Sequence, residues 1–145
     1  MLKDVFIADA CIFDLQGTTK KEVFMQMSEM LKKHNRINNQ EQFVEALMKR
    51  ETEGPTGMGN EVAIPHGKSS CVQAPTVIFG RHKQGISYES LDSLPIKYLF
   101  MIAVPETTAD EHLKILSMLA RKLMHDDFIS NIKKAESGSE IVSLL

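Results

Sequence analysis

The chain has 145 residues, of which 43% are hydrophobic and 25% are charged, and its formal net charge is −2. This length and composition predict one globular domain over residues 1–145 and exclude a disordered or fibrous chain. The nearly balanced charge, without any basic run, argues against nucleic acid as a partner.

Signals for a membrane span or for secretion are not evident. The most apolar stretch, residues 94–104, is too short to span a bilayer and contains Lys97. Asp4 interrupts the N-terminal segment where a signal peptide needs an apolar run. The two cysteines, Cys11 and Cys71, form no CxxC pair. We therefore expect a cytoplasmic protein with reduced thiols.

The N-terminal part of the chain predicts two strands and then a helix. Short runs of β-branched and aromatic residues indicate strands at Val5–Ile7 and Cys11–Phe13. Thr19 and Glu22 have the spacing of a capping box, in which each side chain satisfies a free backbone N–H of the other. Apolar residues then recur at helical spacing, so a helix is expected over residues 19–34.

A second helix is predicted from Asn39 to about Glu53. A capping residue precedes apolar residues at helical spacing there, and Gly54-Pro55 follows as a stop signal. Three further strand candidates come next, at Val62–Ile64, Thr76–Gly80 and Ile96–Val104. The last is a nearly continuous apolar run, which is typical of a strand covered on both faces.

Helices dominate the C-terminal part. Thr108 and Glu111 repeat the capping-box spacing and predict a third long helix that runs to Leu123. Shorter helices are expected over residues 127–134 and 140–144. The resulting order of strands and helices alternates unevenly. It predicts an α/β sandwich with a central mixed sheet flanked by helices.

The five histidines are the first candidates for chemistry, because imidazole titrates near neutrality and is a good nitrogen nucleophile. His34 and His125 are expected at helix ends, where a positive charge suits the macrodipole. His82 is expected in a solvated turn. None of these three positions requires a function.

His66 and His112 have more suggestive surroundings. His66 is expected on a loop after a strand, between Pro65, which fixes φ, and Gly67, which is expected to clear space beside the ring. A plain Pro-His-Gly turn would show the same pattern. His112 falls in the first turn of the third helix, where the dipole favours the neutral ring and free N–H groups suit a phosphate. The alternative is a histidine on a helix face without a role.

Several other kinds of site lack their sequence patterns. No HxxxH or HExxH pair indicates a metal site, and no GxSxG indicates a hydrolase nucleophile. The glycine-rich loop over residues 55–60 lacks the third glycine of a dinucleotide site and the Gly-Lys-Ser/Thr of a nucleotide site. We therefore expect no cofactor and no metal.

A long ordered set of motifs resembles one family. The segment TGMGNEVAIPHGKSS, Thr56 to Ser70, is similar to the active-site motif of the mannitol/fructose-class enzyme IIA domains of the bacterial sugar phosphotransferase system (PTS). The pair Arg50-Glu51 and the turn Gly85–Tyr88 extend the resemblance. It continues through LFMIAVPETTADEHLKILSMLARKL, Leu99 to Leu123, and so spans essentially the whole chain.

The resemblance implies a phosphotransferase that carries a phosphohistidine. In that family the histidine of the IPHG motif, here His66, is phosphorylated. The histidine of the EHL motif, here His112, lies beside it, and the arginine of the RE pair, here Arg50, approaches the same site. The implied donor is the phosphohistidine of HPr. The implied acceptor is a cysteine of a cognate IIB domain, which serves sugar entering through a membrane IIC component.

Three residues depart from the pattern of that family. Glu61 stands where members commonly have a small residue, often glycine, so its charge either repels a phosphate or points to solvent. Tyr88 and Ser93 replace residues often seen as Trp and Gly, which bears on packing more than on chemistry. None of these changes touches the two histidines or the arginine.

Two alternative functions stay open. Nitrogen-related enzyme IIA proteins of the same family are phosphorylated yet act by binding other proteins, and the motif does not separate them from transport components. Without the resemblance, the chain would be a small binding domain whose Pro-His-Gly is only a turn. In that case replacement of His66 would change stability slightly and nothing else.

Overall fold

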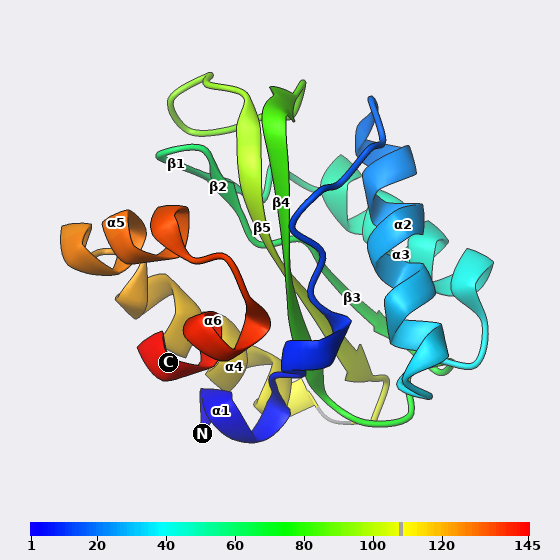
Figure 1. The fold of residues 1–145 in the computed structure, drawn as a ribbon. Coiled ribbons are helices and arrows are strands. Elements are labelled where there is room, and N and C mark those ends of the chain that lie inside the picture. The colour runs from blue at the N-terminus through cyan, green and yellow to red at the C-terminus, as the bar shows by residue number, and fades with distance from the viewer. Residues whose placement is uncertain (108) are drawn as a thin grey trace.

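The computed structural model describes residues 1–107 and 109–145 as a sheet with helices on both sides (Figure 1). The N-terminal helices are α1 (Leu2–Val5), α2 (Lys20–Lys33) and α3 (Gln40–Thr52). The strands are β1 (Gly57–Gly59), β2 (Val62–Ala63), β3 (His66–Ser69), β4 (Thr76–Ile86) and β5 (Ile96–Pro105). The C-terminal helices are α4 (Ala109–Lys122), α5 (Asp126–Lys134) and α6 (Gly138–Leu144).

β5 is the central strand of the sheet. β4 runs antiparallel along one of its edges, while β2 and β3 follow one another, both parallel to β5, along the other. β1 extends the sheet by pairing antiparallel to β2. The sheet is therefore mixed and flanked by helices, which confirms the predicted α/β sandwich.

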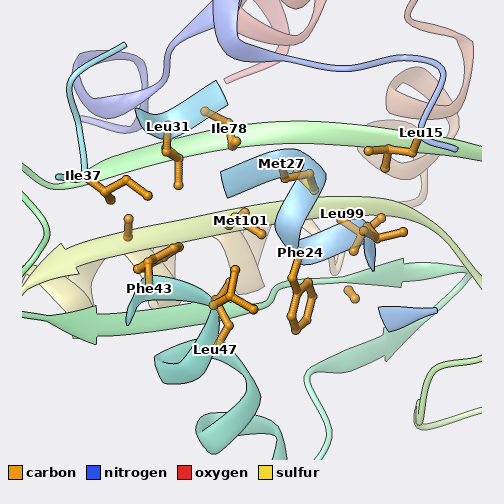
Figure 2. Packing of buried hydrophobic residues seen from close by; sticks show 14 of the residues in the cluster. Leu15, Phe24, Met27, Leu31, Ile37, Phe43, Leu47, Ile78, Leu99 and Met101 are labelled. Carbon is orange, nitrogen blue, oxygen red and sulfur yellow. The ribbon is translucent and has the colours of Figure 1, made fainter. Parts of the chain in front are cut away.

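Successive residues of β5 face opposite layers, as the two-residue period of a strand requires. Leu99, Met101 and Ala103 pack under α2 and α3, where Figure 2 shows side chains such as Phe24 and Phe43 closing over them. Phe100, Ile102 and Val104 pack on the other side with α4, α5 and α6. This double burial confirms the expectation drawn from the continuous apolar run.

The helix predictions hold where the structure describes them. Thr19 and Glu22 form the reciprocal capping box at the start of α2, and the Asn39 side chain accepts a hydrogen bond from the Gln42 N–H at the start of α3. Thr108, the capping residue expected for α4, lies outside the described residues; the helix is described from Ala109.

The two N-terminal strands are predicted wrongly. α1 covers Leu2–Val5, and only Phe6 and Ile12 form isolated bridges to β4. The segment does run beside β4, with the N–H groups of Ile7 and Ile12 donating to Val77 and Phe79 carbonyls. A 3-10 turn at Ala8–Ala10 separates these two contacts. The turn prevents a continuous ladder of hydrogen bonds.

Two strands were not expected, and a third is longer than expected. β1 and β3 have the sequences GMG and HGKS, which lack the β-branched pattern of a strand. They are extended because neighbouring strands offer backbone partners. β4 continues past Gly80 to Ile86 and so includes His82. Among the described residues, no helix is long and apolar enough to cross a membrane.

Candidate functional site

His66 is the first residue of β3, opposite Ile102 of β5, and not part of a loop as expected. Its side chain is buried, with 6% of its surface exposed. β2 and β3 keep the same register against β5, so Ile64 and Pro65 interrupt the ladder without adding a residue. Pro65 has no N–H to offer to the ladder, and its carbonyl accepts from the Ile102 N–H.

The interruption sets the proton position on the His66 ring. The Ile64 N–H turns away to the Thr56 carbonyl, and the Ile64 carbonyl lies 2.9 Å from His66 Nδ1. A carbonyl can only accept, so Nδ1 carries the proton. Nε2 of the neutral ring therefore keeps a free lone pair.

Arg50, from the last turn of α3, points its guanidinium at that lone pair. Its Nε–H donates to His66 Nε2 over 3.1 Å, and its Nη1 donates to the Gly54 carbonyl over 2.9 Å. No ion pair joins Arg50 to a carboxylate in the described part of the chain. The remaining guanidinium N–H groups can therefore bind an anion.

Gly67 brings α3 close to β3. A Cβ atom at this position would lie 2.9 Å from Cε1 of Phe43 and 3.5 Å from Cβ of Ala46. Phe43 and Ala46 belong to the same helix as Arg50. The space that Gly67 leaves is thus filled by α3, whereas the sequence had suggested free space beside the imidazole.

His112 reaches the same site from α4. The centroids of the His66 and His112 rings are 5.0 Å apart, and the ring planes are inclined by 56°. His112 Nε2 is buried and has no hydrogen-bond partner among the described residues. The three residues that the sequence singled out, separated by up to 62 positions, meet at one place.

Burial and neighbouring positive charge keep both rings neutral. Burial lowers the pKa of His66 and outweighs the hydrogen bond to the Ile64 carbonyl, which raises it; the Arg50 charge lowers the pKa further, and Glu51 and Glu53 oppose it least. Burial also lowers the pKa of His112, assisted by the charges of Lys68 and Arg50 and by repulsion from His66 whenever that ring is protonated. A neutral imidazole is the form that can attack an electrophile.

A hollow of about 290 Å³ opens over the two rings. Its lining consists of Ala46, Lys49, Arg50, Glu53, His66, Lys68 and His112. Sequence reasoning missed Lys68, which lies two residues after His66 on β3 and so shares its face. The spacing would have revealed it only if β3 had been recognised as a strand.

Arg50 and His66 also line a second hollow of about 330 Å³. Its other walls are mainly apolar and come from the β1–β2 region and α4, including Met58, Ile64 and Leu116. Among the described residues, no group of three or more His, Cys, Asp or Glu side chains is placed to hold a metal ion. The His66 side chain thus borders two hollows, one lined by Lys49, Arg50 and Lys68 and the other mainly apolar.

The other histidines lie apart from this site. His34 lies at the C-terminal end of α2, as expected. His125 instead precedes the first residue of α5 and its side chain makes no capping hydrogen bond, so the expected favourable interaction with a helix C-terminus is wrong for this residue. His82 is buried in β4 and not in a solvated turn; its Nε2 lies 2.8 Å from the Gly17 carbonyl and its Nδ1 accepts from the Gly85 N–H. The turn prediction failed because β4 continues as a strand through the polar sequence around His82, although its pairing with β5 is interrupted between Arg81 and Ile86.

Glu61 has a paired charge. Its carboxylate lies 3.3 Å from Lys97 Nζ and 3.2 Å from Lys133 Nζ. Partial burial raises the pKa of this carboxyl, but the two lysines outweigh it and hold the pKa low. The backbone at Glu61 has a φ of +69°, the left-handed conformation that favours glycine. The charge is therefore neutralised by β5 and α5 and is not left to repel a phosphate.

Comparison with known proteins identifies the family. The model of the family described as "Phosphoenolpyruvate-dependent sugar phosphotransferase system, EIIA 2" matches residues 4–145. The PTS system fructose-specific EIIA component of Haloferax volcanii is 41% identical over 76% of this chain and 71% of its own length. The PTS system fructose-specific EIIABC component of Bacillus subtilis is 36% identical over 91% of this chain, which spans only 21% of that protein.

A solved structure supports the same conclusion. Nitrogen regulatory protein IIA-Ntr from Neisseria meningitidis superposes with a TM-score of 0.89 at 27% identity, covering 98% of this chain and 97% of its own. Its similarity extends over the same region as the family match, which includes His66, His112 and Arg50. The chain belongs to the EIIA 2 family of the phosphoenolpyruvate-dependent sugar phosphotransferase system.

Proposed function

We propose that this chain is a cytoplasmic phosphocarrier that accepts a phosphoryl group from phospho-HPr on His66 Nε2. It passes the group to a cysteine of a cognate IIB domain, for sugar uptake through a membrane IIC component. The observation that carries this proposal is the placement of Arg50 Nε–H 3.1 Å from the unprotonated nitrogen of a buried histidine. Family membership supplies the class of reaction.

The chemistry balances without a metal, a nucleotide or a separate base. The lone pair of His66 Nε2 attacks phosphorus, and the N–P bond of the donor phosphohistidine breaks with its electron pair returning to the donor ring. The proton on His66 Nδ1 stays in place, where the Ile64 carbonyl at 2.9 Å stabilises the positive charge that develops on the ring. In the second transfer the IIB thiolate attacks phosphorus and the electron pair returns to Nε2.

Positive groups around the hollow stabilise the transferred group. Arg50 can turn its remaining N–H donors to the phosphoryl oxygens once Nε2 is occupied. Lys68, on the same face of β3, adds a positive charge, and the buried Nε2 of His112 is a further polar group with no hydrogen-bond partner in the described part of the chain. Because these groups already line the hollow in the unphosphorylated protein, catalysis reduces to positioning and charge stabilisation.

Phosphorylation with the purified pathway tests the proposal. Enzyme I, HPr and phosphoenolpyruvate should give an acid-labile, base-stable adduct whose ³¹P signal couples to Nε2 of His66. His125→Ala should be labelled like the wild type, because His125 precedes α5 outside the site. Label that persists in His66→Ala would refute His66 as the phosphorylated residue. Coupling of the ³¹P signal to Nδ1 would refute the assignment of the proton to Nδ1 of the unphosphorylated ring.

The similarity to IIA-Ntr supports a second function, regulation through phosphorylation-dependent protein binding. The acceptor chemistry is the same in both cases. Transport requires rapid exchange of phosphoryl with a IIB domain, whereas regulation requires a target whose affinity changes when His66 is phosphorylated. Genes for IIB and IIC components beside this one favour transport, and their absence favours regulation.

A further inference from the structure

A buried carboxylate lies one residue from Arg50 and outside the three-residue site. The side chain of Glu51 has only 4% of its surface exposed. Its Oε2 accepts from the hydroxyl groups of Thr56 and Tyr88, and its Oε1 lies 3.3 Å from Lys20 Nζ. Burying a carboxylate costs free energy unless it is fully paired, and here three separate segments of the chain supply its partners.

The partners of Glu51 also hold each other. The Thr56 and Tyr88 hydroxyl groups also lie within hydrogen-bond distance of each other, and their two protons serve two of the three contacts among Thr56, Tyr88 and Glu51 at a time. Lys20 Nζ lies 4.5 Å from the centre of the Tyr88 ring. Burial raises the pKa of Tyr88, with the negative charge of Glu51 adding to the effect, so the phenol stays protonated and can donate. Each member of this network, defined as Lys20, Glu51, Thr56 and Tyr88, therefore restrains the others.

The network bridges residues 51–56, the segment whose Gly54 carbonyl accepts a hydrogen bond from Arg50. Arg50 Nη1 donates to the Gly54 carbonyl, and the Glu51–Thr56 hydrogen bond closes the same segment two residues further on. Gly54 has a φ of +146°, and a Cβ atom built there would meet nothing within 4 Å. No side chain packs on Gly54, so hydrogen bonds restrain this turn: the Glu53 and Gly54 N–H groups donate to the Arg50 and Glu51 carbonyls, and the Glu51–Thr56 hydrogen bond adds a side-chain restraint across it.

The Glu51 carboxylate forms its ion pair with Lys20 and not with Arg50. Lys20 is the only Lys, Arg or His within 4.0 Å of the Glu51 carboxylate in the described part of the chain. An Arg50–Glu51 ion pair would occupy the guanidinium donors that a phosphoryl group needs. The network therefore restrains the Arg50 segment and leaves the guanidinium available.

We propose that Glu51 is a positioning residue of the phosphoryl site: held by Lys20, Thr56 and Tyr88, it fixes residues 51–56 so that Arg50 stays aimed at His66 Nε2. The kinetic part of this proposal rests on the proposed function. The geometric part concerns the unphosphorylated protein and stands by itself. A purely structural role, closure of the end of α3, would leave Arg50 and His66 unaffected once the fold is intact.

Hydrogen exchange of the Arg50 Nε–H tests the geometry without any phosphorylation. In ¹⁵N-resolved spectra of the unphosphorylated protein, Glu51→Ala should raise its exchange rate about fivefold or more, since one restraining hydrogen bond of roughly 1 kcal/mol corresponds to about a fivefold change in an equilibrium constant. Tyr88→Phe and Glu51→Gln change fewer atoms and should give smaller increases in the same direction. Glu45→Gln removes an exposed carboxylate from the same helix and should leave the rate unchanged.

A double-mutant cycle tests the kinetics with phospho-HPr as donor. Glu51→Ala should lower kcat roughly ten- to hundredfold with KM nearly unchanged, because a buried residue acts on orientation and not on docking. In an Arg50→Ala background the same change should lower kcat by less than about twofold, since its effect passes through Arg50.

The outcomes separate the two proposals. If Glu51→Ala lowers kcat in the Arg50→Ala background by the same factor as in the wild type, Glu51 does not act through Arg50. Unchanged Arg50 exchange in folded Glu51→Gln and Tyr88→Phe would also overturn the positioning role. If wild-type protein takes no label, the proposed function fails, and the exchange measurement still decides whether the network positions Arg50.

Discussion

Replacing Gly67 with alanine tests whether close packing of α3 on β3 holds Arg50 beside His66. The added Cβ would lie 2.9 Å from Phe43 Cε1, whereas carbon atoms are in favourable contact from about 3.5 Å. Phe43 is fully buried, with 0% of its surface exposed, so its ring has no free space to enter. The helix must therefore move by about 0.6 Å to restore an ordinary contact.

That displacement has two measurable consequences. Overpacking of this kind lowers the free energy of unfolding by about 1–3 kcal/mol, which urea titration measures. Transmitted to Arg50, the shift lengthens the 3.1 Å contact to His66 Nε2 to about 3.7 Å, beyond a hydrogen bond. Phosphoryl uptake from phospho-HPr should then slow roughly tenfold or more.

A compensating substitution serves as the control. Phe43→Leu removes the ring edge that the alanine would meet, so the double variant Gly67→Ala/Phe43→Leu should be more stable and faster than the sum of the single effects predicts. Additive effects would refute the packing account. So would a Gly67→Ala protein with wild-type stability and wild-type uptake.

Three further predictions follow from the site and its surroundings. Lys68→Gln should slow phosphoryl uptake roughly tenfold by removing one positive charge from the hollow, while exposed Lys83→Gln leaves the rate unchanged; stopped-flow transfer assays compare the two. Because burial holds the pKa of His66 below the ordinary value near 6.5, its protonation opposes folding, so the free energy of unfolding should fall as the pH drops from about 6.5 through the lowered pKa. Urea titrations at several pH values should show a shallower fall in His66→Gln, and an equal fall in both proteins would contradict the assignment. Glu61→Gly should stay within about 1 kcal/mol of the wild type in the same titrations, because loss of two partly exposed ion pairs is offset by relief of the left-handed backbone; it should not change phosphoryl uptake.

Local signals predicted the helices well because a helix closes its hydrogen bonds within a few residues. The capping box at Thr19 and the cap at Asn39 are both formed, and β5 is covered on both faces as its apolar run indicated. β3 could not be predicted in this way. Its sequence, HGKS, is extended only because β5 lies beside it.

The same distinction applies to the histidines. His82 has a polar, turn-like sequence around it, yet it is buried in β4, where its Nε2 lies 2.8 Å from the distant Gly17 carbonyl. The local sequence could not reveal this, since that partner lies far away in the chain. Lys68 was overlooked for a related reason: its alignment with His66 exists only if both residues lie on one strand.

The sequence by itself determined the class of fold through local periodicity and the family resemblance through ordered motifs, and that resemblance implied the three residues His66, His112 and Arg50. Only the tertiary structure decided which nitrogen of His66 is free, where the charge of Glu61 goes and how Glu51 is held. Each of these depends on atoms from segments far apart in the chain: the turned carbonyl of Ile64, the lysines of β5 and α5, and the Tyr88 hydroxyl. Hydrogen bonds and ion pairs act over a few ångströms, so their partners are known only when the fold has brought those segments together.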